Sequence, residues 1–183
     1  ICRRNAASLD GAAQRIAAQT GTTPIAIPAD VSRPADVARL LDGAMARFGR
    51  IDVLVTNAGG PPPGPFESHD AAAWESAFRL TLASAVELTR RVLPDMKRRR
   101  WGRIINVTSI AVKQPVDNLV LSNSLRAAVT GLARTLATEV AAFGITVNNV
   151  LPGYTRTERV EELVAARSAR EGISVDAVRA ELE

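Results

Sequence analysis

The sequence is poor in the residues that form disulfides and metal sites. One cysteine, Cys2, and one histidine, His69, occur among its 183 residues. A single cysteine cannot form an internal disulfide, and sparing use of cysteine is typical of a reducing compartment, so we expect a cytoplasmic protein. A structural zinc site takes about four cysteine or histidine ligands, so the composition predicts no metal site.

Long apolar stretches are also missing. No run approaches the roughly 18 apolar residues that predict a transmembrane helix, so we expect no membrane partner. Hydrophobic residues still make up 46% of the sequence, which is enough for a globular core, and the length fits one domain. We therefore predict a single domain over residues 1–183.

Lysine is nearly absent, because only Lys97 and Lys113 occur, and arginine carries most of the formal net charge of +4. A basic chain can bind nucleic acid, and the densest basic run is KRRRWGR at 97–103. The same run suits the solvated C-terminal end of a helix, where cations interact favourably with the helix dipole. We favour the helix end and expect no nucleic-acid partner.

Helical and strand patterns alternate along the chain. Helices are expected at 7–19, 36–49, 71–100 and 119–143, with two charged helices at the end, and strands at 23–30, 51–60, 102–109 and 144–153. Pro94 predicts a kink in the longest helix. The strands IDVLV and GRIINV are apolar at nearly every position, which indicates burial on both faces. The alternation predicts an α/β fold, a doubly wound parallel sheet with helices on both faces.

Polar and glycine-rich segments follow the expected strands, where parallel α/β sheets bind their ligands. These segments are Asp30, Asn57–Gly60, Thr108–Ser109 and Pro152–Thr157. Asp30 suits either a cap for the next helix or an acceptor for an amino group such as that of adenine. The glycines after Asn57 allow the backbone to approach a ligand closely, although a plain turn explains them as well.

The stretch LSNSLRAAV at 121–129 opens a predicted helix with small polar residues. Ser122, Asn123 and Ser124 suit a helix N-cap, and Arg126 follows Ser122 by about one turn. Capping needs only one such residue, so it explains the region incompletely. The stretch is therefore also a candidate functional site.

Four motifs occur in order over most of the chain. They are TNAG at 56–59, GRIINVTS at 102–109, the polar helix start thirteen residues after Ser109, and VNNVLPGYTRT at 147–157. Together they resemble the short-chain dehydrogenase/reductase family, and within it the 3-oxoacyl-acyl-carrier-protein reductases. The resemblance implies a Rossmann-like sheet, a nicotinamide dinucleotide, and hydride transfer at a carbonyl or alcohol carbon of a small-molecule substrate. Ser109 then matches the serine that binds the substrate oxygen.

The resemblance also implies a set of cofactor residues at strand ends. They are Asp30 and Val31 at the adenine, Asn57, Ala58 and Gly59 along the sheet, and Pro152, Gly153 and Thr157 at the nicotinamide amide. Arg3 falls where members that prefer NAD usually carry an acid, and Arg4 follows it. An arginine there can pair with a 2′-phosphate, so NADP is expected; exposed charge near the chain end is the alternative.

Three positions depart from the family pattern. Ser122 stands where the family has its tyrosine, Arg126 where it has its lysine, and Thr81 where it usually has an asparagine that holds a relay water. A serine hydroxyl is a poor general acid, and an arginine can hold ribose hydroxyls but does not relay protons, because its pKa lies above about 12. Losing general acid–base help typically slows a reaction roughly 10²–10⁴-fold.

Two functional hypotheses follow from these changes. In the first, the protein is an NADP-dependent reductase whose proton comes from water or another group; Tyr154, the only tyrosine, is one hypothetical donor. In the second, it binds a dinucleotide with little or no turnover, as a sensor or a structural subunit.

The resemblance covers an internal part of the family fold. The first strand with its glycine-rich turn and the last strand have no counterpart, so we expect a Rossmann-like domain truncated at both ends, with an unfilled slot in its sheet. The helices at 71–100 and 119–143 correspond to those that the family uses for subunit contacts. A homodimer or homotetramer is therefore expected by resemblance.

Overall fold

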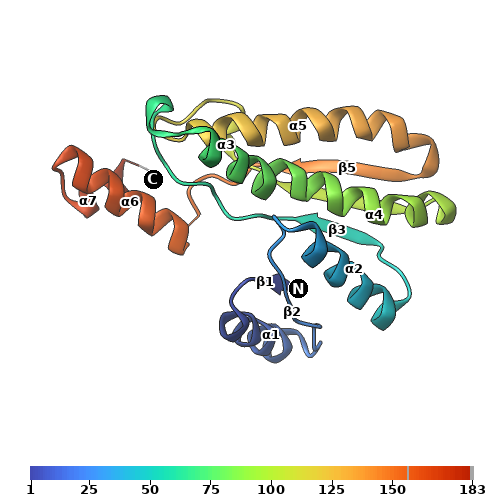
Figure 1. Ribbon diagram of the computed structural model, residues 1–183. Coiled ribbons are helices and arrows are strands. Elements are labelled where there is room, and N and C mark those ends of the chain that lie inside the picture. The colour runs from blue at the N-terminus through green and yellow to red at the C-terminus, as the bar shows by residue number, and fades with distance from the viewer. Residues whose placement is uncertain (156, 182–183) are drawn as a thin grey trace.

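The computed structural model describes residues 1–155 and 157–181, which form a layered α/β structure (Figure 1). Its strands are β1 (Cys2–Arg3), β2 (Ile27–Pro28), β3 (Val53–Thr56), β4 (Gly102–Val107) and β5 (Ile145–Val150). Its helices are α1 (Ala6–Thr20), α2 (Pro34–Phe48), α3 (Ala71–Phe78), α4 (Ser84–Arg99), α5 (Val120–Val140), α6 (Glu158–Glu171) and α7 (Val175–Ala180). No helix within these ranges is long and apolar enough to cross a membrane. The predicted alternation is confirmed, although the strand expected at 23–30 is reduced to two residues.

The described strands form two parallel sheets. β1 pairs with β2, and β4 pairs with β3 on one side and β5 on the other. Leu54, Ile104 and Val147 lie in register across the larger sheet. Because β3, β4 and β5 run parallel, their carboxyl ends share one edge, where Asn57–Gly60, Thr108–Ser109 and the segment from Pro152 follow them; Asp30 instead follows β2 of the smaller sheet.

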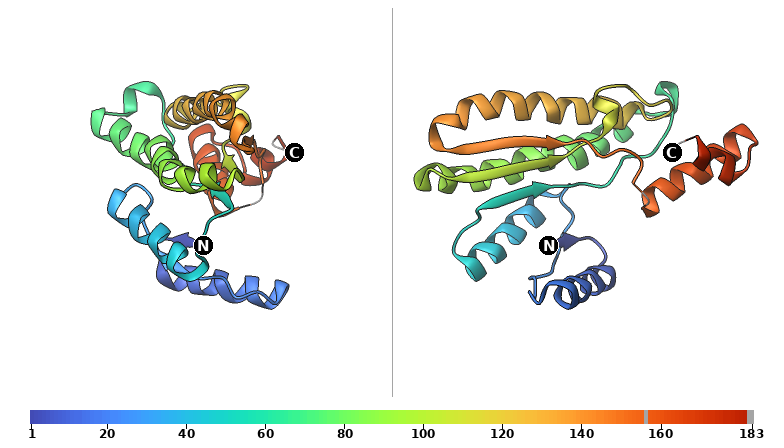
Figure 2. Two further views of the ribbon diagram at one scale, coloured as in Figure 1. Left: turned by 90° about the vertical axis from the view of Figure 1, so that its right-hand side faces the viewer. Right: turned by 180° about the vertical axis from the view of Figure 1, so that it is seen from behind.

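Helices α2, α4 and α5 cover one face of the larger sheet (Figures 1 and 2). The buried side chains of this core are Val37, Leu41, Leu54, Leu88, Val92, Met96, Ile104, Ala133, Val140, Ile145 and Val147. Every second residue of β4 is buried, and Ile104 has no exposed surface. Burial of apolar area at this interface is the main force that holds the helices to the sheet.

The opposite face of β3 is open. Val53 and Val55 are 49% and 54% exposed, whereas Leu54 between them is 7% exposed. The expectation that this strand is buried on both faces is therefore wrong for the described chain. The reason is that α2, α4 and α5 all pack on the side of Leu54.

A π-helical turn interrupts the helix predicted at 71–100. α3 ends at Phe78, the turn spans Arg79–Ala83, and α4 continues through Pro94 to Arg99. The departure from α-helical geometry thus lies around Thr81, whereas the proline predicts it further along. Single π-turns inside helices occur frequently at functional sites, which makes Thr81 a position of interest.

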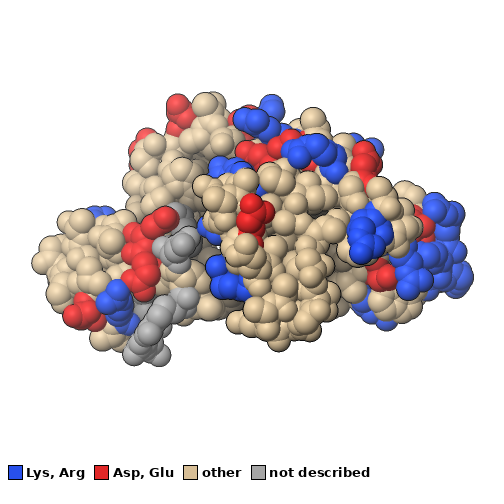
Figure 3. All heavy atoms as spheres, turned by 90° about the horizontal axis from the view of Figure 1, so that it is seen from below, with Lys and Arg blue, Asp and Glu red and all other residues tan. Residues whose placement is uncertain are grey.

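The basic run KRRRWGR ends α4, as predicted. Lys97, Arg98 and Arg99 form the last turn, and Figure 3 shows basic side chains gathered at this end of the molecule. Arg99 pairs with Asp95 at 2.8 Å and with Asp52 at 2.7 Å. Arg99 therefore links the end of α4 to the segment that leads into β3.

Candidate active site

Ser109 lies where β4 leaves the sheet. It begins the short 3-10 helix Ile110–Val112, and its Oγ accepts a hydrogen bond from the Ala111 N–H at 3.1 Å. The Ile110 N–H donates to the Pro152 carbonyl at 3.2 Å, which ties the segment after β4 to the segment after β5. The oxygen of Ser109 is thus oriented by the backbone while its hydroxyl hydrogen can serve a ligand oxygen.

Ser122 and Arg126 lie in the first turns of α5 and line the same cavity as Ser109. They are four residues apart on the helix, and Arg126 Nε donates to Ser122 Oγ at 3.2 Å. Arg126 Nη1 donates to the carbonyls of Val107 and Thr108, each at 3.1 Å. The guanidinium therefore joins α5 to the carboxyl end of β4 and is held in one orientation.

The helix-cap interpretation of Ser122 is wrong. Leu119 is the N-cap residue of α5, and no side chain of the described residues caps this helix end. The neighbouring Asn123 instead uses its Nδ2 to donate to the Val116 carbonyl at 2.8 Å, which holds the preceding loop. Ser122 is left facing Arg126, so a capping role does not explain its polar side chain.

A cavity of about 160 Å³ opens beside these side chains. Its described lining residues are Gly60, Thr108, Ser109, Ile110, Val116, Leu119, Ser122, Arg126, Pro152, Gly153, Tyr154, Val160 and Leu163. Five of the residues predicted for the site meet here, namely Ser109, Ser122, Arg126, Pro152 and Gly153. Among these described lining residues Arg126 alone carries a charge.

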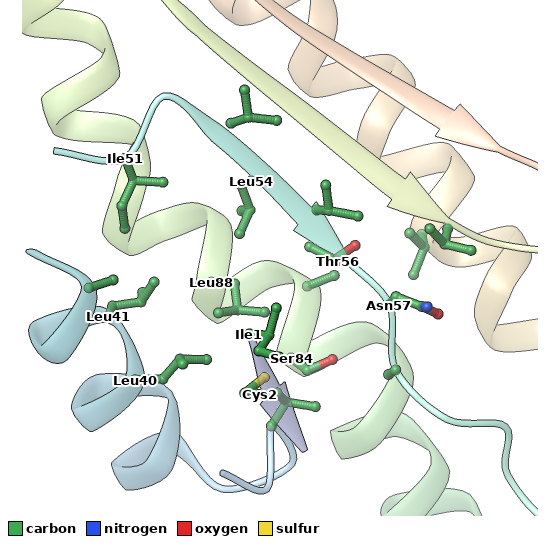
Figure 4. Close-up of a pocket in the computed structure, with 18 of the residues that line it drawn as sticks. Ile1, Cys2, Leu40, Leu41, Ile51, Leu54, Thr56, Asn57, Ser84 and Leu88 are labelled. Atoms are coloured by element: carbon green, nitrogen blue, oxygen red, sulfur yellow. The ribbon is translucent and has the colours of Figure 1, made fainter. Parts of the chain in front are cut away.

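A larger cavity of about 630 Å³ lies between β1, α2, β3 and α4 (Figure 4). Ile51, Leu54 and Leu88 form part of its apolar wall, and Asn57 stands at its end beyond β3 (Figure 4). The predicted site residues that line it are Val31, Asn57, Ala58, Thr81 and Arg126. Thr108 and Arg126 line both cavities, so the two cavities meet at the carboxyl end of β4. The cavity lies between β1 of the smaller sheet and β3 of the larger one.

Thr81 presents an unsatisfied hydroxyl in this larger cavity. Its side chain is 6% exposed, and its Oγ1 has no hydrogen-bond partner in the described structure. An unpaired buried hydroxyl costs free energy, so its retention suits a site in which a bound ligand supplies the missing partner.

Replacing Thr81 by valine is expected to raise the free energy of unfolding by about 1 kcal/mol, because an unpaired hydroxyl is exchanged for a methyl group of similar size. Urea denaturation of both proteins measures this difference. Thr56→Val is the matched control: Thr56 Oγ1 donates to Asn106 Oδ1 at 2.7 Å in a buried pair, so its loss is expected to destabilise by about 1–3 kcal/mol. Destabilisation by Thr81→Val would contradict the assignment of an unpaired hydroxyl.

Five predicted residues do not line either cavity. They are Arg3, Arg4, Asp30, Gly59 and Thr157. Arg3 and Arg4 lie exposed at the end of β1, and Thr157 caps α6, with its Oγ1 accepting from the Val160 N–H at 3.3 Å. Arg156, which follows Tyr154 by two residues and could also meet a substrate, lies outside the described residues.

The carboxylate of Asp30 is held by the turn that follows β2. Its Oδ1 accepts from the Ser32 hydroxyl at 2.7 Å and from the Ser32 N–H at 3.0 Å. The hydrogen bond from the Ser32 side chain lowers the pKa of Asp30 below its ordinary value, and the nearby charges of Arg4 and Arg33 lower the pKa further. Asp30 does not cap α2, whose N-cap is Arg33, so its carboxylate can also accept from a ligand amino group.

The lowered pKa of Asp30 predicts a pH-dependent contribution to stability. The ionised carboxylate stabilises the folded chain above the unfolded pKa of about 3.9, and this contribution is lost as the pH falls through the lower folded pKa. The stability difference between the unmodified protein and Asp30→Asn is therefore expected at pH 7 and shrinks below about pH 4. Chemical denaturation from pH 7 to pH 3 measures it. Ser32→Ala removes the main cause of the shift and should reduce the pH-dependent part; an unchanged difference would contradict the prediction.

Two glycines predicted for the cofactor site have open space around them. A Cβ placed on Gly59 or Gly153 would meet no atom within 4 Å, and neither residue has a positive φ, so neither packing nor conformation requires glycine there. Open space over both glycines suits close approach of a ligand to the backbone. Within the described ranges no strand leads directly through a glycine-rich turn into a helix, which is the usual pyrophosphate cradle.

Comparison with known proteins identifies the family of this α/β chain. Residues 1–168 match the family model described as short chain dehydrogenase. The chain belongs to the short-chain dehydrogenase family. Its curated relatives in this family include the D-beta-hydroxybutyrate dehydrogenase of Rhizobium meliloti, 32% identical over 165 residues, with 89% of this chain and 63% of the relative covered. The 3-oxoacyl-[acyl-carrier-protein] reductase of Synechocystis is 34% identical over 145 residues, which cover 79% of this chain and 59% of the relative.

Solved structures of other short-chain dehydrogenases share the fold. An actinorhodin polyketide ketoreductase with NADPH has a TM-score of 0.90 at 28% identity, with 96% of this chain and 68% of that chain covered. The 7 alpha-hydroxysteroid dehydrogenase with NADH and 7-oxo glycochenodeoxycholic acid has a TM-score of 0.83 at 27% identity, with 91% of this chain and 66% of that chain covered. The two proteins thus carry different nicotinamide cofactors. The chain spans about three fifths of the length of the curated relatives it matches.

Sequence reasoning missed the partners of Arg126. The family resemblance assigns this position to the cofactor ribose, whereas the structure directs Nη1 to the Val107 and Thr108 carbonyls. No sequence signal reveals this contact, because any residue type can offer a backbone carbonyl. The apolar walls contributed by Leu119, the N-cap residue of α5, and by Leu163 in α6 were also missed.

Proposed function

We propose that this chain binds NADP and takes part in hydride transfer to or from a carbonyl or alcohol carbon of a small molecule. One observation carries the proposal. Ser109, Ser122 and Arg126 converge on the smaller cavity, and Arg126 also lines the larger cavity that contains Asn57 and Ala58. A reacting oxygen and a cofactor can therefore meet at the carboxyl end of β4, where parallel sheets bind ligands.

The roles of the residues follow from their hydrogen bonds. When bound, the reduced dinucleotide supplies a hydride, and the carbonyl oxygen takes up one proton to become an alcohol. Ser109 donates its hydroxyl hydrogen to the substrate oxygen, because its Oγ is already oriented by the Ala111 N–H. Arg126, held by two carbonyls, supplies a fixed positive charge that stabilises negative charge on that oxygen.

The proton source is the weakest part of this site. Ser122 accepts from Arg126 and is too weakly acidic to deliver the proton itself. Tyr154 lines the smaller cavity and is 43% exposed, so it can reach both substrate and solvent. We propose solvent as the main donor and Tyr154 as an assisting one. Tyr154→Phe is expected to lower the turnover number if tyrosine assists, and unchanged turnover would assign the proton to water alone.

Arg3 and Arg4 support NADP over NAD in this proposal. Both side chains are exposed at the end of β1, and the charge of Arg4 acts on Asp30, so a 2′-phosphate beside Asp30 would meet positive charge. NADPH is expected to bind more tightly than NADH. Arg4→Gln should weaken NADPH binding and leave NADH binding nearly unchanged, as fluorescence titration with each nucleotide measures.

A second candidate function is dinucleotide binding with little turnover. It is favoured by Ser122 and Arg126, because neither residue can pass a proton and Arg126 is engaged with β4. The protein would then act as a sensor or a structural subunit. The helices α4 and α5 support a homodimer or homotetramer by analogy with the family, which light scattering tests.

One experiment separates these candidates. The protein is titrated with NADPH by fluorescence, and oxidation is then followed with a panel of small ketones, oxo acids and 3-oxoacyl thioesters. Oxidation that is lost in Ser109→Ala supports the reductase. Binding without oxidation supports the sensor, and absence of nucleotide binding contradicts both.

A further inference from the structure

We propose that the substrate carries an uncharged apolar tail, and that this tail occupies a second cavity beside the smaller one. This inference rests on the proposed function, because it names the substrate class of the same site. It follows from the position of the second cavity, from its apolar walls, and from the pairing of the charges around it.

The second cavity adjoins the smaller cavity. It has a volume of about 280 Å³ and lies between the loop that precedes α5 and the helices α6 and α7, which stand beyond the carboxyl ends of the strands (Figure 1). The two cavities share the lining residues Val116, Leu119, Tyr154, Val160 and Leu163. The second cavity shares no described lining residue with the larger cavity proposed for the cofactor. A substituent on the reacting carbon can therefore extend into the second cavity without meeting the cofactor.

Neither of the two adjoining cavities has the size of a usual ligand pocket by itself. Their volumes of about 160 and 280 Å³ each fall below the roughly 300 Å³ at which pockets for drug-sized ligands begin, whereas together they exceed it. The smaller cavity has room for the reacting carbon and a few atoms near Ser109 and Ser122. The second cavity then has room for a chain of several carbon atoms.

The walls of the second cavity are mainly apolar. Helix α6 contributes Leu163 and Val164, and α7 contributes Val178; Val164 is 1% exposed and Val178 is 0% exposed. The chain before α5 adds Val116 and Leu119. Each methylene group of a ligand that leaves water against such walls strengthens binding by about fourfold. The walls therefore select an alkyl or alicyclic tail.

The charged side chains of the second cavity are paired or exposed to water. Arg167 is paired with Glu171 at 2.9 Å and also with Glu181, and Arg170 is paired with the same Glu171. Asp117 is exposed, so solvent and salt screen its charge. A charged group at the end of the tail would lose its hydration without gaining an unpaired partner of opposite charge. The second cavity thus favours an uncharged tail.

Both sides of the second cavity are held in place by hydrogen bonds. The Asn118 carbonyl accepts from the Gly64 N–H at 2.7 Å, which fixes the loop before α5. Ser168 Oγ donates to the Ile173 carbonyl at 2.6 Å, which fixes the turn between α6 and α7. Because little ordering is needed when a ligand enters, the apolar contacts contribute directly to affinity.

Three ligands test the proposal: methyl ethyl ketone, methyl hexyl ketone, and the oxo acid in which a carboxylate replaces the terminal methyl group of the hexyl chain. Calorimetric titrations are run with and without NADP⁺, which cannot reduce a ketone. Methyl hexyl ketone is expected to bind at least about tenfold more tightly than either of the other two. Equal binding of the two ketones, no binding of the longer ketone, or binding of the oxo acid as tight as that of the longer ketone would overturn the proposal.

Two neighbouring alanines of α6 assign the preference to the second cavity. Both are exposed, and Ala166 lines the second cavity but not the smaller one, whereas Ala165 is not among the described lining residues of either. Ala166→Phe is expected to remove most of the advantage of the longer ketone, because the ring takes up the space of the tail. Ala166→Leu should remove part of it and guards against misfolding of the phenylalanine variant. Ala165→Phe is the matched control and should keep the full advantage.

Urea denaturation verifies that each variant is folded. An undiminished advantage of the longer ketone in folded Ala166→Phe, or in folded Ala166→Leu if the phenylalanine variant does not fold, would overturn the proposal. Loss of the advantage in Ala165→Phe would also overturn it, because the tail would then lie outside the second cavity.

The outcome is distinguishable from that of the broader functional proposal. Dependence on chain length is measured by ketone binding, and nucleotide binding has its own fluorescence titration. Dependence on chain length without nucleotide binding would refute the oxidoreductase proposal alone, and nucleotide binding without dependence on chain length would refute only the substrate class.

Discussion

Replacing Ser122 by tyrosine together with Arg126 by lysine is expected to raise the turnover number with a small ketone by about 10²–10⁴-fold. Ser122 lines the same cavity as Ser109 and lies one turn before Arg126, so a phenol there would reach the substrate oxygen that we propose Ser109 binds. A tyrosine has a pKa near 10, and a neighbouring ammonium lowers this pKa toward neutrality. The pair would therefore supply the proton that serine and arginine cannot.

The single variants distinguish this explanation from a general effect. Ser122→Tyr alone keeps the arginine, which stabilises the ionised phenol but is committed to the β4 carbonyls; we expect a smaller gain. Arg126→Lys alone lacks an acid and should give no gain. The rate is measured with saturating NADPH between pH 5 and pH 10, where the double variant should show a new titration from the phenol.

Ser124→Tyr is the matched control for the double variant. Ser124 lies two residues further along α5 and is exposed, so its tyrosine would point away from the cavity. It should leave turnover unchanged. If the double variant binds NADPH normally and turns over no faster than the unmodified protein, the assignment of Ser122 to the proton-donor position is wrong.

Replacing Ile104 by alanine is expected to lower the free energy of unfolding by about 3–4 kcal/mol. Ile104 has no exposed surface and lies at the centre of β4, in register with Leu54 and Val147 beneath α2, α4 and α5. The smaller side chain loses apolar contacts and leaves a cavity that the rigid sheet cannot close. Because whole domains are stable by only about 5–15 kcal/mol, the change is large.

Ile105→Ala is the matched control for this prediction. It makes the same chemical change at the next position of β4, on the opposite face, where the side chain is only partly buried. Ile105→Ala is expected to lower the free energy of unfolding by at most about half as much as Ile104→Ala does. Urea denaturation of the three proteins measures both differences, and equal losses would contradict the assignment of the core to one face of the sheet.

Much of the fold was predictable because its signals are local. Apolar strands followed by glycines, helix-spaced leucines and valines, and Gly49 after α2 all mark elements within a few residues of themselves. The order of the motifs around Asn57, Ser109 and Pro152 then indicated the family, which the match over residues 1–168 confirms. The limits of β2 were not predictable, because its two residues count as a strand only through pairing with β1.

The candidate site was predictable only in part. The thirteen-residue spacing from Ser109 indicated Ser122, and the structure brings both to one cavity. The π-turn around Thr81 was not predictable, since its residues have ordinary helical propensity and the turn depends on how α3 and α4 pack.

The sequence by itself determined the alternation of strands and helices and the order of motifs that indicated the family. These properties depend on residue types and on their spacing along the chain. Only the tertiary structure decided that Ser122 does not cap α5, that Arg126 binds two carbonyls at the end of β4, and that Thr81 is buried with no hydrogen-bond partner among the described residues. Each of these depends on atoms from distant parts of the chain, and hydrogen-bond partners across such distances are chosen by packing rather than by residue type.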